Sequence, residues 1–378
     1  MKINQKKEEL LALDYISQGD YSSAIRIYEE FIRLEIANNI HYTNLAFIYA
    51  KNNDWNNVII YCKKAISLNP QSYNAWSILG LAFKNEFDYL NAVLAYEKAI
   101  KIKPDFFDAI CNLGLVKHKL GDYNKAQNTY SQALKLNSNS FILFYNIANL
   151  FYDQCDFENA ILNYNKSIKL NEKFSLAYLN LALTFRKLQN LNETLICINK
   201  AFELDNNNPL IRKALIMSEN QICYWKNYDI RIQWLNKLGL IGTSISPMGV
   251  ISLEDSPERQ LIRAKRFFKD NFIKEKLIIN VKQHKLIRIG YFSGNFYEHA
   301  VSHLLVRTLE LHNKDKFKVF SYSFSKEKYD QYTERFTSAS DYYRDVNNFS
   351  DLEVAKLVAS DEIDIAIDLM GYSDNNRH

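Results

Sequence analysis

The sequence predicts an α-helical solenoid, built from stacked pairs of helices, followed by a partial α/β domain around a parallel sheet. Two observations lead to this prediction. First, one pattern of aromatic and small residues returns at a constant interval through the N-terminal half of the chain. Second, apolar runs of strand length alternate with runs of helical periodicity from residue 286 onward. We therefore divide the chain into residues 1–208, 209–285 and 286–378.

The composition indicates packed structure and argues against several functional classes. The chain has 378 residues, enough for two or three domains, and 47% of them are hydrophobic. A net charge of +4 gives little support for nucleic-acid binding. The apolar runs are far shorter than the roughly 20 residues that span a bilayer, so we expect no membrane segment.

The N-terminus and the cysteines indicate a cytoplasmic protein. The first residues, MKINQKKEELLALDY, are polar and amphipathic and lack the apolar core of a signal peptide. The five cysteines stand far apart, without a CxxC pair or any clustered spacing. We therefore expect reduced, mostly buried thiols, as in proteins of a reducing compartment.

The repeated pattern is clearest in residues 74–104, which read NAWSILGLAFKNEFDYLNAVLAYEKAIKIKP. Its landmark residues are Trp76, Leu79, Gly80, Phe83, Tyr89, Ala92, Tyr96, Ala99 and Pro104. This order of large and small residues resembles the tetratricopeptide repeat, a pair of helices with a period of about 34 residues. Shifts by one such period recover the pattern in both directions, and six repeats cover about residues 5–208. A small residue at one place in each repeat lets the two helices approach, and aromatic rings fill the space between them.

A polar position also recurs within the repeats. Four asparagines stand one or two repeat lengths apart on the predicted first helix of their repeats: Asn44, Asn112, Asn146 and Asn180. One interpretation is that asparagine merely suits a solvated helix face. Asparagine is a mediocre helix former, however, so its return at one register favours a ladder of amide groups that binds the backbone of an extended peptide. Ile78 and Leu10 interrupt this ladder.

Residues 209–285 form a predicted connector. They contain Pro209, Pro247 and Pro257, so we expect turns within this stretch. The stretch PLIRKALIMSENQICYWKNYDIRIQWLNKL keeps helical periodicity and is expected to cap the solenoid. The stretch PERQLIRAKRFFKDNFI is expected to form one more amphipathic helix, with Asp255 or Ser256 near its start.

Residues 286–378 alternate between strand and helix patterns. We expect strands at LIRIGYF (286–292), KVFSYSF (318–324), DYYRDV (341–346) and IDIAIDLM (363–370). Helical patterns lie between them, and Ser350 with Glu353 predicts a capping box at the start of the last helix. Such alternation, with strands apolar on both faces, indicates a parallel, doubly wound sheet. Ligands bind such sheets at the carboxyl ends of the strands, where the loops at residues 293–299 and 371–378 lie.

The same stretches carry a family resemblance. RIGYFSGNFYEHAVSHLL, HNKDKFKVFSYSFS and IDIAIDLMGYSDNN resemble the start of the catalytic region of family 41 glycosyltransferases, which include the protein O-GlcNAc transferases and the Spindly-like enzymes. The specific element is the combination of G-Y-x-S-x-x-F-x-x-H-x-V-S-H with D-L-x-G-Y. CYWKNYDIR and SPMGVISLEDSPERQL resemble the connector of the same family. The resemblance implies a Rossmann-like, partial N-terminal lobe of the two-lobed GT-B fold, and a UDP-sugar donor, typically UDP-GlcNAc.

The resemblance also implies an active site at the first of these loops. His299 matches the family's active-site histidine, which lies beside the donor and the acceptor hydroxyl as a base or a positioning group, and imidazole chemistry suits both roles. His303, one turn further on, is expected to pack against or orient the site. Asn295 stands where family members often have aspartate. Asp368 and Tyr372 are expected to line the same cleft, unless Asp368 instead caps its loop.

A metal site at the histidine pair is not expected. His299 and His303 stand four residues apart, but the AVS between them lacks the glutamate of an HExxH motif, and no third ligand suggests itself. The resemblance likewise implies no cofactor besides the UDP-sugar donor.

Two functions follow from these patterns. The first is a glycosyltransferase that attaches a sugar, N-acetylglucosamine by resemblance, to Ser or Thr hydroxyls of polypeptides recruited by the repeats; some Spindly-like relatives use fucose. The second is a non-catalytic repeat scaffold for protein assembly. The Arg-Pro-Ala-Pro segment and the donor-binding lobe of the family are not found in the 378 residues. We therefore expect these residues to be the N-terminal part of a longer enzyme and to transfer no sugar alone.

Overall fold

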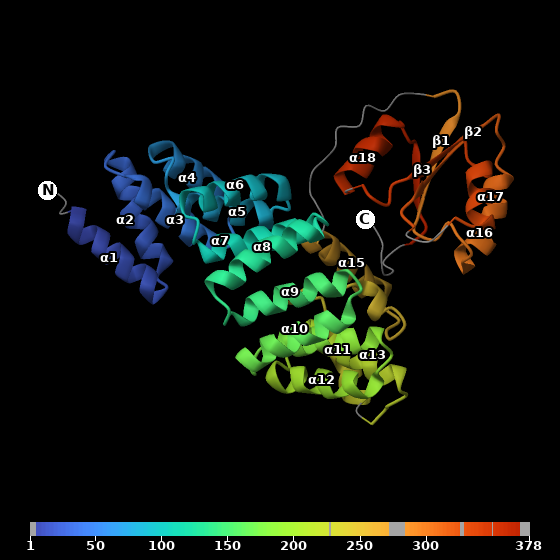
Figure 1. Ribbon diagram of the computed structural model, residues 1–378, viewed down its shortest axis with the longest axis horizontal. Coiled ribbons are helices and arrows are strands. Elements are labelled where there is room, and N and C mark those ends of the chain that lie inside the picture. The colour runs from blue at the N-terminus through green and yellow to red at the C-terminus, as the bar shows by residue number, and fades with distance from the viewer. Residues whose placement is uncertain (1–4, 227, 272–283, 326–328, 350, 371–378) are drawn as a thin grey trace. The chain divides into compact units, whose positions relative to one another are not determined.

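The predicted fold class, a helical solenoid followed by a partial α/β domain, is confirmed by a computed structural model of the chain (Figure 1). The structure describes residues 5–226, 228–271, 284–325, 329–349 and 351–370. These residues form two compact units, which divide between Trp225 and Lys226. The predicted connector, residues 209–285, is therefore shared between the two units.

The first unit is a stack of helix pairs, which follow one another from blue to yellow-green in Figure 1. Its first twelve described helices have 13 or 14 residues each, and α13 packs against α12 at the end of the stack. The helices are α1 (Gln5–Gln18), α2 (Tyr21–Arg33), α3 (Asn39–Lys51), α4 (Trp55–Leu68), α5 (Tyr73–Asn85), α6 (Tyr89–Ile102), α7 (Phe107–Lys119), α8 (Tyr123–Leu136), α9 (Phe141–Asp153), α10 (Phe157–Leu170), α11 (Ser175–Lys187), α12 (Leu191–Leu204) and α13 (Pro209–Gln221).

Close contact between the two helices of a pair explains the small residues of the repeat. A Cβ atom added to Gly80 of α5 would lie 2.9 Å from the ring of Tyr96 on α6, and one added to Gly114 of α7 would lie 2.5 Å from the ring of Tyr130 on α8. Both distances are too short for a side chain without movement of the ring. The tyrosine rings therefore lie directly on the backbone of the preceding helix, as the alternation of small and aromatic residues predicts.

The turn inside each pair has a fixed backbone geometry. In each turn one residue has a left-handed backbone, with φ between 56° and 79°. These residues are Gly19, Asn53, Phe87, Gly121, Cys155 and Gln189. The next residue in four of these turns is an aspartate that caps the second helix, with its side chain accepting the N–H of the third residue on: Asp20, Asp54, Asp88 and Asp156. Such caps satisfy an N–H group that the helix itself leaves unpaired.

The second unit begins with short helical pieces held by a buried arginine. The pieces are α14 (Tyr228–Ile232), the 3₁₀ turns η1 (Gln233–Asn236) and η2 (Pro247–Gly249), and α15 (Pro257–Asn271). Arg263 of α15 is fully buried; its guanidinium donates to the carbonyl groups of Leu235 and Leu238 and pairs with Glu254. A buried charge needs such partners, so this cluster fixes the connector.

The α/β domain is a four-stranded sheet in which all described strands are parallel, as predicted. Its elements are β1 (Ile287–Ser293), α16 (Ala300–Glu310), β2 (Phe317–Ser323), α17 (Gln331–Ala339), β3 (Tyr342–Asp345), α18 (Asp351–Ser360) and β4 (Ile365–Asp368). The strand order is β3-β2-β1-β4. Ser350, one partner of the predicted capping box, lies outside the described residues.

Helices cover both faces of this sheet. Ile289 and Tyr291 of β1 pack with Val306 and Leu309 of α16 and with Phe336 of α17. On the other face, a second cluster joins β2 and α18: Phe320, Tyr322, Phe324, Val346, Val354, Leu357 and Val358. Figure 1 shows α18 on one side of the strands and α16 with α17 on the other. Because the strands are parallel, their carboxyl ends, and the loops that follow them, lie at one edge of the sheet.

Candidate functional site

The loop between β1 and α16 lies at the carboxyl end of the sheet. β1 ends at Ser293 and pairs with β4, where Phe292 is opposite Asp368. The loop begins at Gly294, where a Cβ atom would lie 3.2 Å from the ring of Phe324. Phe296, which is almost fully buried, anchors the middle of the loop against Phe336.

Hydrogen bonds from two helices hold this loop. The Ser302 hydroxyl on α16 donates to the carbonyl of Asn295 at 2.6 Å, and the Thr333 hydroxyl on α17 donates to the carbonyl of Phe296 at 2.8 Å. The N–H of Glu298 donates to the Asp330 carboxylate, which also caps α17. The loop is therefore clamped by side chains that come later in the chain, on α16 and at the start of α17.

The Asp330 carboxylate is held ionised at this clamp. Desolvation by itself would raise the pKa of Asp330, but hydrogen bonds from the backbone N–H groups of Thr333 and Glu298 outweigh it. The Thr333 hydroxyl, whose one proton is shared between the Phe296 carbonyl and the Asp330 carboxylate, adds to this effect. The pKa of Asp330 therefore lies below its usual value. At neutral pH the clamp keeps its negative charge at the start of α17, where the helix dipole favours it.

His299 is the N-cap residue of α16. It is half exposed, with an extended backbone, and its Nδ1 accepts the N–H of Val301 at 3.2 Å. Since Nδ1 uses its lone pair in this bond, the neutral ring carries its proton on Nε2. Nε2 is then a hydrogen-bond donor. The ring of Tyr297 lies beside the imidazole, with 5.7 Å between the ring centroids.

His303 lies one turn further along α16 and contacts α17. Its Nδ1 is 2.6 Å from the hydroxyl of Tyr332, and the two rings meet edge to face at 4.6 Å. The side chain is exposed. The structure thus gives His303 a partner on α17, which fits a role in packing or orientation.

Asn295 and Asp368 come together around one methionine. The Asn295 side-chain amide donates to the sulfur of Met370 at 3.1 Å, and the Asp368 carboxylate accepts the N–H of Met370 at 2.8 Å. Asp368 therefore caps the end of β4, one of its two expected roles, while remaining exposed. Tyr372 lies outside the described residues.

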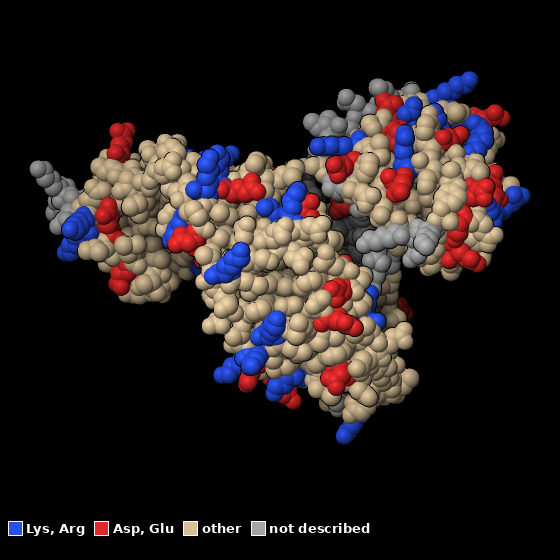
Figure 2. Space-filling model, viewed as in Figure 1, with Lys and Arg blue, Asp and Glu red and all other residues tan. Residues whose placement is uncertain are grey.

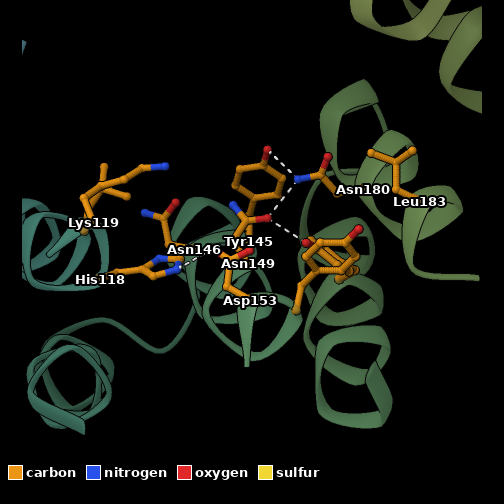
Figure 3. Close-up of a pocket in the computed structure, with 11 residues that line it drawn as sticks. His118, Lys119, Tyr145, Asn146, Asn149, Asp153, Asn180 and Leu183 are labelled. Carbon is orange, nitrogen blue, oxygen red and sulfur yellow. Dashed lines mark hydrogen bonds and ion pairs between the residues drawn. The ribbon is translucent and has the colours of Figure 1, made fainter. Parts of the chain in front are cut away.

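A second candidate site is a groove in the solenoid with a volume of about 430 Å³ (Figure 3). It lies between α7, α9, α10 and α11, and the ladder residues Asn146 and Asn180 both line it. The other two ladder residues lie outside this groove. Asn44 donates to the hydroxyl of Tyr28 at 2.9 Å, and Asn112 donates to the carbonyl of Asp108 at 2.9 Å.

Three further groove residues were not predicted from the sequence: Asn149, His118 and Asp153. Asn149 lies between the ladder asparagines and bonds to Asn180 at 2.8 Å. His118 is only 5% exposed, and its Nε2 lies 2.8 Å from the Asp153 carboxylate. A comparison of repeats gives the missed signal for Asn149, because the equivalent positions one repeat before and one repeat after it are Leu115 and Leu183.

Three general features bear on possible ligands. Figure 2 shows basic and acidic side chains intermixed over the visible face of the first unit. Among the residues that the structure describes, no three or more His, Cys, Asp or Glu side chains gather closely enough to hold a metal ion. None of the described helices has both the length and the apolar character needed to cross a lipid bilayer.

Parts of the chain match known protein families. Residues 261–378 match glycosyl transferase family 41, and this match runs from α15 through the whole described sheet. Residues 88–121 and 117–154 match one tetratricopeptide-repeat family, and residues 42–72, 143–174 and 176–208 match another. The repeat matches fall on helices α3 and α4 and on helices α6 to α12.

Two plant proteins are similar to a quarter of the chain. The chain is 34% identical over 94 residues to the probable UDP-N-acetylglucosamine–peptide N-acetylglucosaminyltransferase SEC of Arabidopsis thaliana. It is 34% identical over 95 residues to the probable enzyme of the same description, SPINDLY, also of Arabidopsis thaliana. These stretches cover 25% and 24% of this chain and 10% of each plant protein, so the chain spans about a tenth of the length of the curated relatives it matches.

A solved structure shares the solenoid fold. It is a tetratricopeptide repeat protein from Parabacteroides merdae, with a TM-score of 0.54 and 15% identity, and the match covers 69% of this chain and 98% of that one. At this identity the likeness concerns the fold alone. The chain therefore combines stretches that match tetratricopeptide repeats with a segment that matches glycosyl transferase family 41.

Proposed function

We propose that this protein takes part in the transfer of N-acetylglucosamine from UDP-GlcNAc to Ser or Thr hydroxyls of other proteins, in the cytoplasm and without a metal ion. The solenoid binds the acceptor polypeptide, and the α/β domain supplies the acceptor side of the active site as the N-terminal lobe of a GT-B fold. One observation carries the proposal. His299 stands half exposed at the carboxyl end of β1, inside the segment that matches family 41.

The reaction requires one bond to form and one to break. The acceptor hydroxyl oxygen bonds to the anomeric carbon of the sugar, the bond from that carbon to UDP breaks, and UDP leaves with the electron pair while the hydroxyl loses its proton. His299 with Nδ1 bonded to Val301 cannot take this proton at Nε2, because Nε2 already carries one. We therefore assign His299 a positioning role, in which Nε2–H donates to an oxygen of the acceptor or the donor.

The clamp around the loop supports this role. To position a reacting atom, a side chain has to be held to within roughly 0.5 Å of its working position by its surroundings. The Phe296 ring, the Thr333 hydroxyl and the Asp330 carboxylate fix the loop that carries His299. His299 is thus carried on a rigid loop at an open edge of the sheet.

The groove of the solenoid supports the acceptor role. Asn146 and Asn180 stand one repeat length apart in sequence and line the same groove on adjacent first helices, α9 and α11. Their amide groups can donate to and accept from the backbone of an extended polypeptide, whatever its side chains. The solenoid therefore provides binding with little sequence requirement, which suits an enzyme with many acceptors.

A hybrid enzyme tests the proposal. Residues 261–378 replace the aligned segment of an active family 41 glycosyltransferase, and incorporation of radiolabelled N-acetylglucosamine into an acceptor protein is measured. We expect the hybrid to transfer the sugar, and we expect the 378-residue chain alone to transfer none. A hybrid that folds and binds UDP-GlcNAc but never modifies an acceptor contradicts the proposal and favours the non-catalytic scaffold.

A further inference from the structure

The groove in the solenoid contains one asparagine, Asn149, at a position where neighbouring repeats have leucine. Asn149 of α9 lies three residues after the ladder residue Asn146. The same place in neighbouring repeats, one or two repeat lengths away, holds Leu81, Leu115 and Leu183. Asn149 is therefore the polar exception among these aligned positions, and it lies on the wall of the groove.

The fold of the repeat does not require Asn149. Its Oδ1 accepts the hydroxyl of Tyr164 at 2.6 Å, so satisfying a buried tyrosine is the obvious structural role. However, Tyr96 and Tyr130 occupy the same place as Tyr164 in the preceding repeats, and their buried hydroxyl groups have no hydrogen-bond partner within the described part of the chain. Two repeats thus form the same helix pair with leucine opposite tyrosine.

The hydrogen bonds of Asn149 fix the orientation of two amides in the groove. Asn149 Oδ1 accepts from the Tyr164 hydroxyl and from Asn180 Nδ2 at 2.8 Å, and Asn180 Nδ2 also donates to the Tyr145 hydroxyl at 2.9 Å. Both lone pairs of Asn149 Oδ1 and both N–H groups of Asn180 are then used. Desolvation raises the pKa of Tyr145, and the side chains of Asn149 and Asn180 partly oppose this rise.

One donor and one acceptor remain for a ligand. The donor is Nδ2 of Asn149 and the acceptor is Oδ1 of Asn180, and the hydrogen bonds described above use neither of these atoms. Figure 3 shows the nitrogen of Asn149 and the oxygen of Asn180 on the lining of the groove, with Tyr145 between them. A carboxamide has both an acceptor and a donor, so it can pair with a donor and an acceptor that line one groove.

The charges on the lining favour an uncharged ligand. Lys119 is basic, Asp153 is acidic and His118 already pairs with Asp153. The lining therefore has no excess of acidic over basic side chains that would favour a charged ligand.

We propose that this groove is a subsite for the side-chain carboxamide of a glutamine or asparagine in the bound polypeptide. The proposal rests on the proposed acceptor-binding function and adds a side-chain preference to it. A backbone-binding residue is expected in repeat after repeat, as in the asparagine ladder. A polar residue that occurs in one repeat alone among the aligned positions recognises a group that occurs once, and the volume of about 430 Å³ leaves room for a side chain.

Peptide binding to the 378-residue chain tests this inference without any sugar transfer. The probes are fluorescein-labelled Ser/Thr/Gly peptides that carry a single Gln, and matched peptides with Glu, Lys or Ala in its place. Fluorescence anisotropy gives the affinities. We expect the Gln peptide to bind roughly 10-fold more tightly than the others, because each of them leaves a donor or acceptor of the groove unpaired.

Three variants separate side-chain recognition from general binding. Asn149→Leu restores the residue of the neighbouring repeats and should bring the Gln and Ala peptides to within about 2-fold of each other. Asn149→Asp keeps the shape but replaces the N–H donors with an oxygen, so it should abolish the Gln preference and favour the Lys peptide. The control is Asn146→Leu, a ladder variant, which should weaken all peptides by the same factor.

The outcomes distinguish the two proposals. If the groove binds peptides but prefers Glu or Lys, or if Asn149→Leu weakens the Gln and Ala peptides equally, the carboxamide subsite is wrong and acceptor binding survives. If no peptide binds and Asn146→Leu changes nothing, the proposal that the groove binds acceptors is wrong, and the proposal of a carboxamide subsite is wrong as well. The folding of each variant is checked by circular dichroism.

Discussion

The backbone N–H of Val301 donates to Nδ1 of His299 at 3.2 Å. This one bond makes the histidine the N-cap of α16 and leaves Nε2 as the donor of the neutral ring. His299, the residue that the family resemblance identifies, thus caps a helix through Nδ1 and retains Nε2–H as a donor for a ligand. Variants that separate the two functions are therefore the informative ones.

The hydrogen bond from Thr333 of α17 to the loop between β1 and α16 should contribute measurably to the free energy of unfolding. Thr333→Val keeps the shape of the side chain but removes the hydroxyl that donates to the buried carbonyl of Phe296. We expect a loss of about 1–3 kcal/mol in the stability of the α/β domain, because that carbonyl is left unpaired and the capping box of Asp330 with Thr333 loses its side-chain hydroxyl. Thr337→Val is the matched control, since the exposed Thr337 hydroxyl bonds only to the carbonyl of Thr333 on its own helix.

Amide hydrogen exchange locates the effect of the clamp. In the Thr333→Val variant, exchange should accelerate in residues 294–303, and in the Thr337→Val variant it should stay within the wild-type range. Equal exchange in both variants would show that α17 does not hold the loop.

Opposite substitutions at two left-handed turn positions should change the stability of the solenoid in opposite directions. Gln189 has a φ of 58° and is exposed, while Gly121 has a φ of 78° at the same place two repeats earlier. A side chain in this conformation costs about 1–2 kcal/mol, which exceeds the entropy that glycine loses. We expect Gln189→Gly to raise the thermal unfolding temperature of the solenoid and Gly121→Ala to lower it. A decrease with both substitutions would contradict this account of the turn.

The stability of the α/β domain should depend on pH through His312. Burial, with a smaller contribution from the positive charge of Lys314, holds the pKa of His312 below its ordinary value of 6.5. Its Nε2 lies 2.7 Å from the Tyr291 hydroxyl. As the pH falls, the unfolded chain takes up the proton first, so the stabilisation by neutral His312 is fully present above pH 6.5 and is lost as the pH falls through the folded-state pKa.

Unfolding by urea at a series of pH values measures this effect. The difference in unfolding free energy between the wild type and His312→Gln should shrink from about pH 7.5 to about pH 5. In the Lys314→Met variant, the pKa of His312, followed by NMR, should move back toward its ordinary value. A constant difference across this range would refute the assignment.

The solenoid was predictable from the sequence because one constraint recurs. Each repeat needs a small residue under the tyrosine ring, as at Gly80 and Gly114, and this need imposes the same period on the whole array. The strands were predictable because both faces of the sheet are covered, so their apolar runs are continuous. The expectation that the thiols are mostly buried was only partly right, since Cys155 and Cys223 are exposed.

The site was less predictable than the fold. Its position at the end of β1 follows from the strand pattern, but the partner of His299 Nδ1 depends on the local backbone of the loop. The clamp could not be read from the sequence, because nothing in a residue pattern says that the N-cap of α17 faces a loop that lies before α16 in the chain. Asn149, by contrast, was detectable as the exception to a leucine register.

The most direct test of the account is sugar transfer by the hybrid enzyme with His299 replaced by alanine or by asparagine. Asparagine can keep the bond to the N–H of Val301 and so retain the cap, but it does not reach the position of Nε2. We predict that His299→Asn restores the thermal stability that His299→Ala loses, while both variants transfer N-acetylglucosamine at least about 100-fold more slowly than the unmodified hybrid. Wild-type transfer by His299→Asn would show that the histidine serves only as a helix cap and would contradict the central claim.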